Sequence, residues 1–457
     1  MREIKRSRSG GQIAILTGLV LLVLVGVTGL ALDSGLGYML RARLNSALDA
    51  AAIAAARSVV VSEAAAVKSA NDFFAANYPT DLWGSTPTLD SVVVTPDQGR
   101  WIIDVAATAT VPVNIMGVFG FNLLTVKSVA QVVRKDLDLA FVMDTTDSMA
   151  PVAANVKSSA KSFLDHFSAT TDRFALIHFA HGAVVDVPFK ADFSRGFDRA
   201  TMKARIDAFG FNGFTNYSEG FWNARDQLNR IPLAKRSSLR VIVFFSDGSP
   251  NTFASHFQFR SSPSCVTSPE TFVAGALQTA ANPTGEPDGL WRYDVQTQPL
   301  AGTCYRGTSI VGCTTGTCLT AAAIPAWYNP HNRLGEMEFP VVTGSPRVVT
   351  NSTASEAVAY RNVNRASRNL PEAMAAKSRD EGIYVYTLGL GSHVLDLTGP
   401  DNEDGESLLK CMANTPDSLA RCYKADKPKG DYCWAKTDND LKACYDRLAS
   451  EIMKITK

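Results

Sequence analysis

Leu137-Asp138-Leu139-Ala140-Phe141-Val142-Met143 is a mainly apolar run, and Asp144-Thr145-Thr146-Asp147-Ser148 follows it directly. A short apolar run of this kind predicts a strand buried in a parallel sheet. Where that strand ends, the polar segment offers the carboxylate of Asp144 and the hydroxyls of Thr146 and Ser148. Because oxygen ligands suit hard divalent cations, the segment indicates a site for an ion such as Mg²⁺.

Strand and helix patterns alternate after residue 136. The alternation predicts an α/β fold with a doubly wound, mostly parallel sheet that helices cover on both faces. In such sheets, ligands bind at the carboxyl ends of the strands. The expected strands are 137–143, 174–179, 183–189, 240–245 and 383–388, and the expected helices are 152–167, 197–209, 218–231, 370–380 and 438–455.

Two further segments supply candidate ligands. Thr215 offers a hydroxyl on the glycine-rich loop 210–216, and Asp247 places a carboxylate at the end of the 240–245 strand. We expect them to join Asp144 at the same edge of the sheet, since the carboxyl ends of parallel strands meet there. The alternative is that these Asp, Ser and Thr side chains only cap the 152–167 helix and satisfy loop amides.

The three segments resemble the metal-ion-dependent adhesion site (MIDAS) of the von Willebrand factor A (VWA) family. That family has the pattern Asp-x-Ser-x-Ser, a distant Thr, and an Asp usually followed by Gly. The resemblance implies that a divalent cation, Mg²⁺ or alternatively Mn²⁺ or Ca²⁺, is held by Asp144, Thr146, Ser148, Thr215 and Asp247. Thr146 stands where Ser is usual but keeps the hydroxyl. The resemblance also implies an open coordination position for an acidic side chain of a protein partner.

The N-terminal region is apolar enough to cross a membrane. No charged residue lies in 9–32, and the segment 13–32 has the roughly 20 residues that a spanning helix needs. Basic residues in the segment 1–12 place it in the cytoplasm and the bulk of the chain outside the inner membrane, by the positive-inside rule. A cleaved signal peptide is the alternative, with small residues at 29–31, but the apolar segment is longer than a signal peptide requires.

Residues 33–134 predict a small α+β module. Leu40, Leu44 and Leu48 recur at helical spacing in an alanine-rich stretch, which we expect to continue the membrane helix as a stalk. A buried alanine-rich core helix is a compatible alternative. Alternating residues around a turn then indicate a β-hairpin. The expected elements are a helix over 36–77, a hairpin over 88–105 with its turn at 96–99, a short amphipathic segment at 113–121 and a strand at 124–133.

The N-terminal region also resembles the TadG-like proteins of bacterial tight-adherence (Tad) pilus assembly. The resemblance is carried by the basic start, the single anchor and Leu44-Asn45-Ser46-Ala47-Leu48-Asp49-Ala50-Ala51-Ala52. It implies an inner-membrane protein of Flp pilus assembly in which a VWA domain, here 135–457, follows the anchor and the module. Gly11 precedes Gln12-Ile13-Ala14-Ile15-Leu16, without the Glu found in processed pilin-like subunits, so we do not expect pilin processing.

The stretch 249–366 interrupts the α/β pattern. It is rich in Ser, Thr, Gly and Pro, and a structureless segment of this length is improbable in a compact domain, so we expect an inserted, disulfide-rich subdomain. The chain has eight cysteines, an even number, and we expect them to form disulfides in an oxidising compartment. The sequence does not determine which cysteines pair. Zinc binding is the weaker alternative, since C-x-x-C is absent. The cysteines form two sets, Cys265, Cys304, Cys313 and Cys318, then Cys411, Cys422, Cys433 and Cys444.

Composition and motifs narrow the classes of function. The formal net charge is +1, so there is no electrostatic reason to expect nucleic acid as a partner. The sequence lacks G-x-S-x-G, H-E-x-x-H and a P-loop, and we do not expect an enzyme. Our leading hypothesis is a single-pass periplasmic protein of pilus assembly or surface adhesion that binds a pilus or envelope component through its cation. The alternative is a structural scaffold of the envelope with a vestigial metal site.

Overall fold

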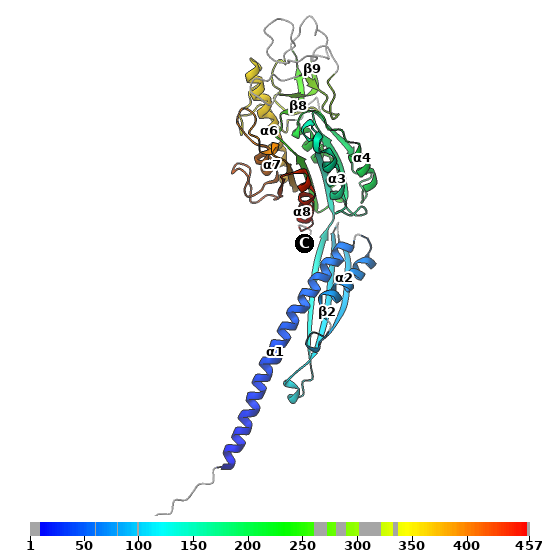
Figure 1. Cartoon of the computed structure of the whole chain (residues 1–457), viewed down its shortest axis with the longest axis vertical. Coiled ribbons are helices and arrows are strands. Elements are labelled where there is room, and N and C mark those ends of the chain that lie inside the picture. Colours follow the sequence, from blue (N-terminus) through cyan, green and yellow to red (C-terminus); the bar gives the residue numbers. More distant parts are fainter. Residues whose placement is uncertain are drawn as a thin grey trace, which may run out of the picture. The chain divides into compact units, whose positions relative to one another are not determined.

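The computed structural model describes residues 10–59, 61–79, 81–97, 100–259, 272–279, 289–300, 321–331 and 337–454 (Figure 1). These residues form two compact units, which divide between Lys135 and Asp136. Each unit has its own hydrophobic core, and each is described by itself below.

The first unit begins with the helix α1 (Gly10–Ser58), which contains the predicted membrane segment. The helix α2 (Glu63–Asn77) follows and packs against α1. The prediction of one uninterrupted helix to Asn77 was therefore wrong. The physical reason lies at Ser62, whose hydroxyl accepts a hydrogen bond from the Ala65 N–H at 3.0 Å and so starts a new helix. The β-branched residues before Ser62 also disfavour helix continuation.

Three antiparallel strands complete the first unit, in the order β1-β2-β3. Leu40, Leu44 and Leu48 of α1 are buried in one cluster with Ile103 and Val105 of β2. The predicted hairpin and third strand are present but longer than expected. The elements are η1 (Leu82–Gly84), β1 (Thr86–Asp97), β2 (Arg100–Pro112), η2 (Met116–Phe119) and β3 (Leu123–Lys135).

A six-stranded sheet organises the second unit, in the order β12-β11-β7-β4-β5-β6. Every neighbouring pair is parallel except β5 and β6, so the predicted mostly parallel, doubly wound sheet is confirmed. The strand β4 is central and buried along its whole length. The strands are β4 (Leu137–Asp144), β5 (Arg173–Phe179), β6 (Ala183–Val187), β7 (Leu239–Ser246), β11 (Ile383–Leu390) and β12 (Tyr432–Ala435).

Helices cover both faces of this sheet (Figure 1). Phe141 of β4 packs in a cluster with residues of α3, α4 and α8, whereas its neighbour Val142 packs in a cluster with residues of α5, α6 and α7. Alternate residues of a strand therefore pack into the hydrophobic cores on opposite faces of the sheet. The helices are α3 (Ala153–Leu164), α4 (Arg199–Ala208), α5 (Tyr217–Arg230), α6 (Glu356–Asp380), α7 (Gly405–Ala413) and α8 (Leu441–Lys454). Short 3₁₀ turns are η3 (Asp147–Val152), η4 (Leu233–Lys235), η5 (His393–Leu395) and η6 (Asp438–Asp440).

The predicted insert contains more regular structure than its composition suggested. A small antiparallel sheet, in the order β10-β9-β8, lies within it. The insert also ends earlier than predicted, because α6 begins at Glu356 rather than near residue 370. Pro371 lies inside α6, and the helix continues through this residue. The strands are β8 (Thr252–Gln258), β9 (Phe272–Gln278) and β10 (Leu290–Trp291).

Disulfides pair the second set of cysteines within itself. Cys411 bonds to Cys422, and Cys433 bonds to Cys444, with a sequence separation of 11 in each case. The first bond ties α7 to the loop that follows, and the second ties β12 to α8. The regular spacing thus reflects two closed loops of equal length. The four cysteines of the first set lie outside the described residues.

Candidate functional site

Two carboxylates lie at neighbouring strand ends of the sheet. Asp144 is the last residue of β4, and Asp247 follows the last residue of β7, the strand that pairs with β4. Both side chains are buried, with exposed fractions of 0% and 5%. Ser246 donates its hydroxyl hydrogen to Oδ2 of Asp144 and so joins the two strand ends.

Hydroxyl groups connect these carboxylates. The backbone N–H of Thr146 donates to Oδ1 of Asp144 at 2.9 Å, and the hydroxyls of Thr146 and Ser148 lie 3.2 Å apart. The Ser148 hydroxyl then donates to Oδ1 of Asp247 at 2.9 Å. Four of the five predicted site residues therefore form one hydrogen-bonded oxygen cluster. Thr146 precedes η3 without a side-chain capping bond, so the capping alternative does not describe this residue.

Thr215 reaches this region on its own loop. The N–H of Asn212 donates to the carbonyl of Thr145 at 2.9 Å, and the N–H of Asp147 donates to the carbonyl of Gly213 at 3.2 Å. The backbone N–H of Thr215 donates to Oδ1 of Asn251 at 3.0 Å. The backbone therefore brings the Thr215 loop against the segment that carries Thr146 and Ser148.

Burial makes both carboxylates of the cluster harder to ionise than carboxylates in water. Burial, with a further contribution from the charge of Asp247, raises the pKa of Asp144 to about 8. Burial also raises the pKa of Asp247 to about 6, although the hydrogen bond from Ser148 opposes this shift. A bound divalent cation would stabilise both carboxylates in their charged form.

The donor set fits a hard cation with retained water. It consists of carboxylate and hydroxyl oxygens without sulfur or nitrogen, which is the chemistry that Mg²⁺, Mn²⁺ and Ca²⁺ prefer. Asp144 and Thr146 are buried while Ser148 is exposed, so the cluster opens toward solvent on the Ser148 side.

A segment of the insert braces the loops around the cluster. The side-chain amide of Gln296 donates to the carbonyl of Gly210 at 2.7 Å and to the hydroxyl of Thr145 at 3.1 Å. The Thr297 hydroxyl donates to the carbonyl of Asn212 at 3.0 Å. Residues 289–300 therefore connect the Asp144 segment to the Thr215 loop.

Sequence reasoning missed three residues that order the site: Ser246, Asn251 and Gln296. Ser246 directly precedes Asp247, and its hydroxyl at the end of a buried strand was a usable signal. Asn251 and Gln296 lie in the Ser-, Gly- and Pro-rich stretch, where no periodicity predicts their contacts. Two histidines lie near the β5–β6 turn and are held by side-chain contacts: His178 bonds to Asp186 at 2.6 Å, and buried His181 contacts Gln278.

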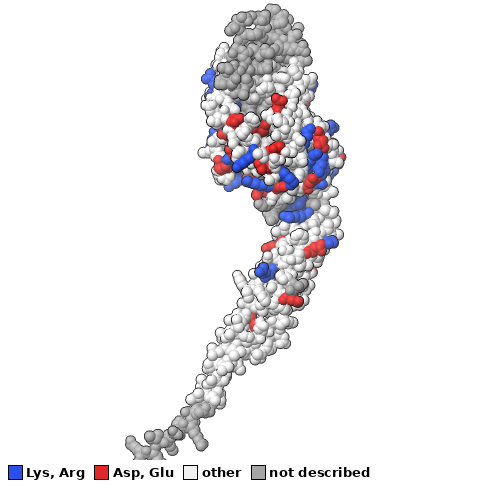
Figure 2. Space-filling view, in the orientation of Figure 1, with Lys and Arg blue, Asp and Glu red and all other residues white. Residues whose placement is uncertain are grey.

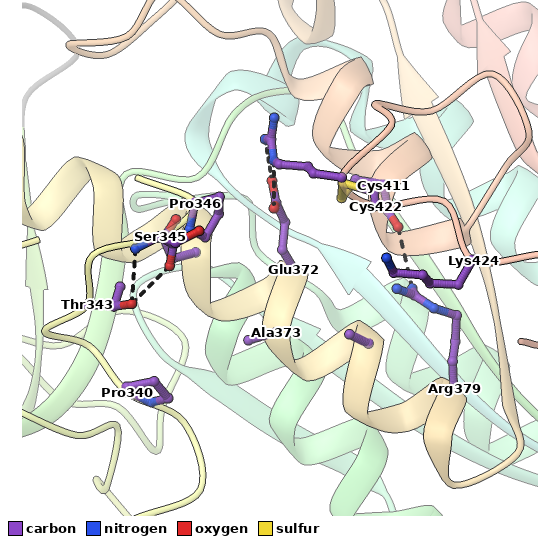
Figure 3. Close-up of a pocket in the computed structure, with 13 residues that line it drawn as sticks. Pro340, Thr343, Ser345, Pro346, Glu372, Ala373, Arg379, Cys411, Cys422 and Lys424 are labelled. Carbon is purple, nitrogen blue, oxygen red and sulfur yellow. Dashed lines mark hydrogen bonds and ion pairs between the residues drawn. A yellow bond between two sulfur atoms is a disulfide. The ribbon is translucent and has the colours of Figure 1, made fainter. Parts of the chain in front are cut away.

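A cavity of about 300 Å³ lies elsewhere in this unit, and none of the five predicted residues lines it (Figure 3). Glu372 and the sulfurs of Cys411 and Cys422 lie close together there. The two sulfurs are bonded to each other in a disulfide, and the Glu372 carboxylate forms ion pairs with Arg347 at 2.8 Å and Arg421 at 3.0 Å. This cluster is therefore a poor metal site.

Comparisons with known families match two segments of the chain. Residues 139–249 match the family described as von Willebrand factor type A domain, and residues 11–58 match the family described as putative Flp pilus-assembly TadE/G-like. The first match spans both strand ends and the Thr215 loop. No curated protein matches the sequence.

Several solved structures are similar at low identity. The vWF domain of the type V pili tip protein Mfa5 from Porphyromonas gingivalis is 16% identical with a TM-score of 0.38, over 71% of this chain and 97% of that one. The pilus adhesin SpaC from Lactobacillus rhamnosus GG is 13% identical with a TM-score of 0.37, over 81% and 34%. A point mutant of the PilB minor pilin from Streptococcus sanguinis is 12% identical with a TM-score of 0.36, over 83% and 81%.

Proposed function

Since this chain joins a TadE/G-like N-terminal segment to a von Willebrand factor type A domain, we propose that it is a membrane-anchored protein of Flp pilus assembly or surface adhesion that binds a protein partner through a divalent cation. The cation is Mg²⁺, or Mn²⁺ or Ca²⁺ in its place. The partner is a pilus or envelope component that offers an Asp or Glu side chain. The protein is a binding protein and not an enzyme.

One observation carries the metal proposal, which is the cluster that links Asp144, Thr146, Ser148 and Asp247. Two buried carboxylates with raised pKa values lie at adjacent strand ends, and hydroxyls connect them. Burying two carboxylates together is costly unless a positive charge or protons accompany them. A cation held by these oxygens supplies that charge and presents a Lewis-acidic position to a partner's carboxylate.

The anchor proposal is supported by α1, the helix of the described chain that is long and apolar enough to cross a membrane. Thr17 and Thr28 lie within its apolar part, and their hydroxyls donate back to the carbonyls of Ile13 and Leu24 at 2.8 Å. Such bonds satisfy hydroxyls where water is absent. The basic N-terminus then faces the cytoplasm and the VWA domain the periplasm of a bacterial inner membrane.

Calorimetric titration with Mg²⁺ and Mn²⁺ tests the metal. Asp144→Ala and Asp247→Ala should each weaken binding by at least about tenfold, since each removes a charged oxygen donor of the cluster. Asp147→Ala is the matched control, because this exposed carboxylate lies in the same segment outside the cluster. Equal binding by the wild type and Asp144→Ala would refute the metal site.

Partner capture distinguishes adhesion from the scaffold alternative. Crosslinked partners recovered from native membranes should decrease on adding EDTA and in Asp247→Ala, and should return when Mg²⁺ is restored to the wild type. Capture that persists under both changes would favour a scaffold whose site is vestigial.

A further inference from the structure

The β2–β3 turn of the first unit lies against the apolar part of α1. Residues 113–122 connect the two strands through η2. A Cβ atom at Gly29 would lie 2.7 Å from Cγ2 of Ile115, and one at Gly26 would lie 3.3 Å from the ring of Phe119. Both glycines belong to the segment 13–32 that we propose to span the membrane. Small residues at these positions therefore let the turn approach the anchor closely.

Asp33 fixes this arrangement at the end of the apolar segment. Its carboxylate is buried and accepts hydrogen bonds from the backbone N–H groups of Asn114, Ile115 and Met116, at 3.0, 3.2 and 2.9 Å. The Met116 bond contributes most to lowering the pKa of Asp33. The α-helix rises 1.5 Å per residue, so Gly26 lies about 10 Å from Asp33 along the anchor, toward the interior of the membrane.

The turn has the composition of a surface in contact with lipid. No charged residue lies between Val105 and Val126. Val118 and Phe121 of this turn are 80% and 60% exposed, and exposed apolar side chains that gather in one segment mark a surface for contact with a partner or a membrane. In the space-filling view, the corresponding end of the first unit is almost free of charged residues (Figure 2).

The backbone of the turn is largely satisfied without water. Three backbone N–H groups of the turn donate hydrogen bonds to Asp33. The N–H groups of Val118, Gly120 and Phe121 donate to carbonyls within the turn. Irregular backbone enters hydrocarbon only when its polar groups have protein partners. The sequence of this turn therefore combines apolar side chains with an internally bonded backbone.

We infer that the tip of the β2–β3 turn, residues 115–121, inserts into the membrane leaflet next to Asp33, beside the spanning helix. The occupant of this apolar surface is lipid hydrocarbon, because the tip contacts the anchor about 10 Å inside the end of its apolar segment. The first unit would then attach to the membrane at two points, the anchor and the turn, and the contact would restrict the tilt of the three-stranded sheet relative to the anchor. This inference rests on the proposed anchor.

Fluorescence quenching in vesicles tests the insertion with the full chain. Val118→Trp places an indole on the tip, and Val93→Trp is the matched control at a 50% exposed position of β1 that pairs with Asp104, well away from the turn. Each variant is compared with the parent, which has six tryptophans, in vesicles of phosphatidylethanolamine and phosphatidylglycerol. The vesicles also contain phosphatidylcholine, used either unmodified or with bromine on its acyl chains. Bromine quenches tryptophan in the membrane interior, and iodide quenches tryptophan that is exposed to water.

The tip should lose more than about half of its added emission to acyl-chain bromine and little to iodide, since hydrocarbon excludes iodide. Val93→Trp should show the opposite pattern. Iodide quenching at both positions, in a chain that floats with the vesicles, would overturn the insertion and leave the anchor standing. Protection of Val118→Trp from both quenchers would mean that protein, such as a second copy, covers the tip, which would also overturn the insertion. A chain that does not float would overturn anchor and insertion together.

Discussion

The side-chain amide of Gln296 donates to the carbonyl oxygen of Gly210 at 2.7 Å, although 86 residues separate them in the sequence. The same amide reaches Thr145, which lies between the cluster residues Asp144 and Thr146. A segment inserted late in the domain therefore helps to fix the loops on which the candidate ligands lie. The affinity of the site should depend on this residue even though it contributes no ligand.

Gln296→Ala should weaken cation binding while leaving the fold in place. Two loops would lose a shared donor, and a buried or half-buried hydrogen bond contributes about 1 kcal/mol, so we expect an affinity loss of roughly fivefold. Gln298→Ala is the control, because this nearby residue is exposed. Calorimetric Mg²⁺ titration of both variants measures the effect, and equal affinities would show that the insert does not order the site.

Gly213→Ala should disturb the Thr215 loop. Gly213 has φ of +98°, and a Cβ there would clash with Oγ1 of Thr297 and would lie 2.6 Å from Nδ1 of His181. The backbone conformation and the crowding both disfavour a side chain, so we expect a destabilisation of about 1–3 kcal/mol. Denaturant unfolding checks this against Gly344→Ala, where a Cβ would meet nothing within 4 Å. Matching midpoints for the two variants would contradict the close packing.

Without divalent cations, the second unit should become less stable as pH rises from about 4 to 8. The pKa of Asp144 is raised to about 8, so in this window the folded state binds more protons than the unfolded state. Stability then falls by up to about 1.4 kcal/mol per pH unit for each such proton. Thermal unfolding in EDTA across this range measures the slope.

Mg²⁺ should reverse this loss, and more strongly at pH 8 than at pH 5, because bound metal replaces the protons. Asp144→Asn should flatten the EDTA profile and abolish the Mg²⁺ effect. A wild-type stability that is independent of pH and Mg²⁺ would argue that the two carboxylates are not buried together.

Removing the Cys433–Cys444 disulfide should destabilise the second unit, since this bond ties the edge strand β12 to α8. Both cysteines are buried. Closing a loop of 11 residues lowers the entropy of the unfolded chain, which should raise the free energy of unfolding by roughly 3 kcal/mol. The Cys433→Ala/Cys444→Ala variant should therefore unfold at lower denaturant than the wild type. Reductant should shift the wild type more than the variant, and a wild type that is insensitive to reductant would contradict the prediction.

Local sequence pattern was enough to predict the sheet, its strand ends and the apolar N-terminal helix. Runs such as 137–143 are apolar because both of their faces are buried, and this property can be read without knowing the partners of the strand. The acidic residues that follow those runs, Asp144 directly and Asp247 after Ser246, are placed by the same local rule, because the carboxyl ends of neighbouring parallel strands lie at one edge of the sheet. The helical stripe of leucines in α1 was equally readable.

The contacts that support these elements became visible only in the folded chain. Gln296 and Asn251 brace loops that are distant in sequence, and hydrogen bonds from irregular segments leave no periodic signal, because donor and acceptor meet only after folding. The approach of the β2–β3 turn to Gly26 and Gly29 has the same origin: glycine permits the contact, but the folded sheet makes it.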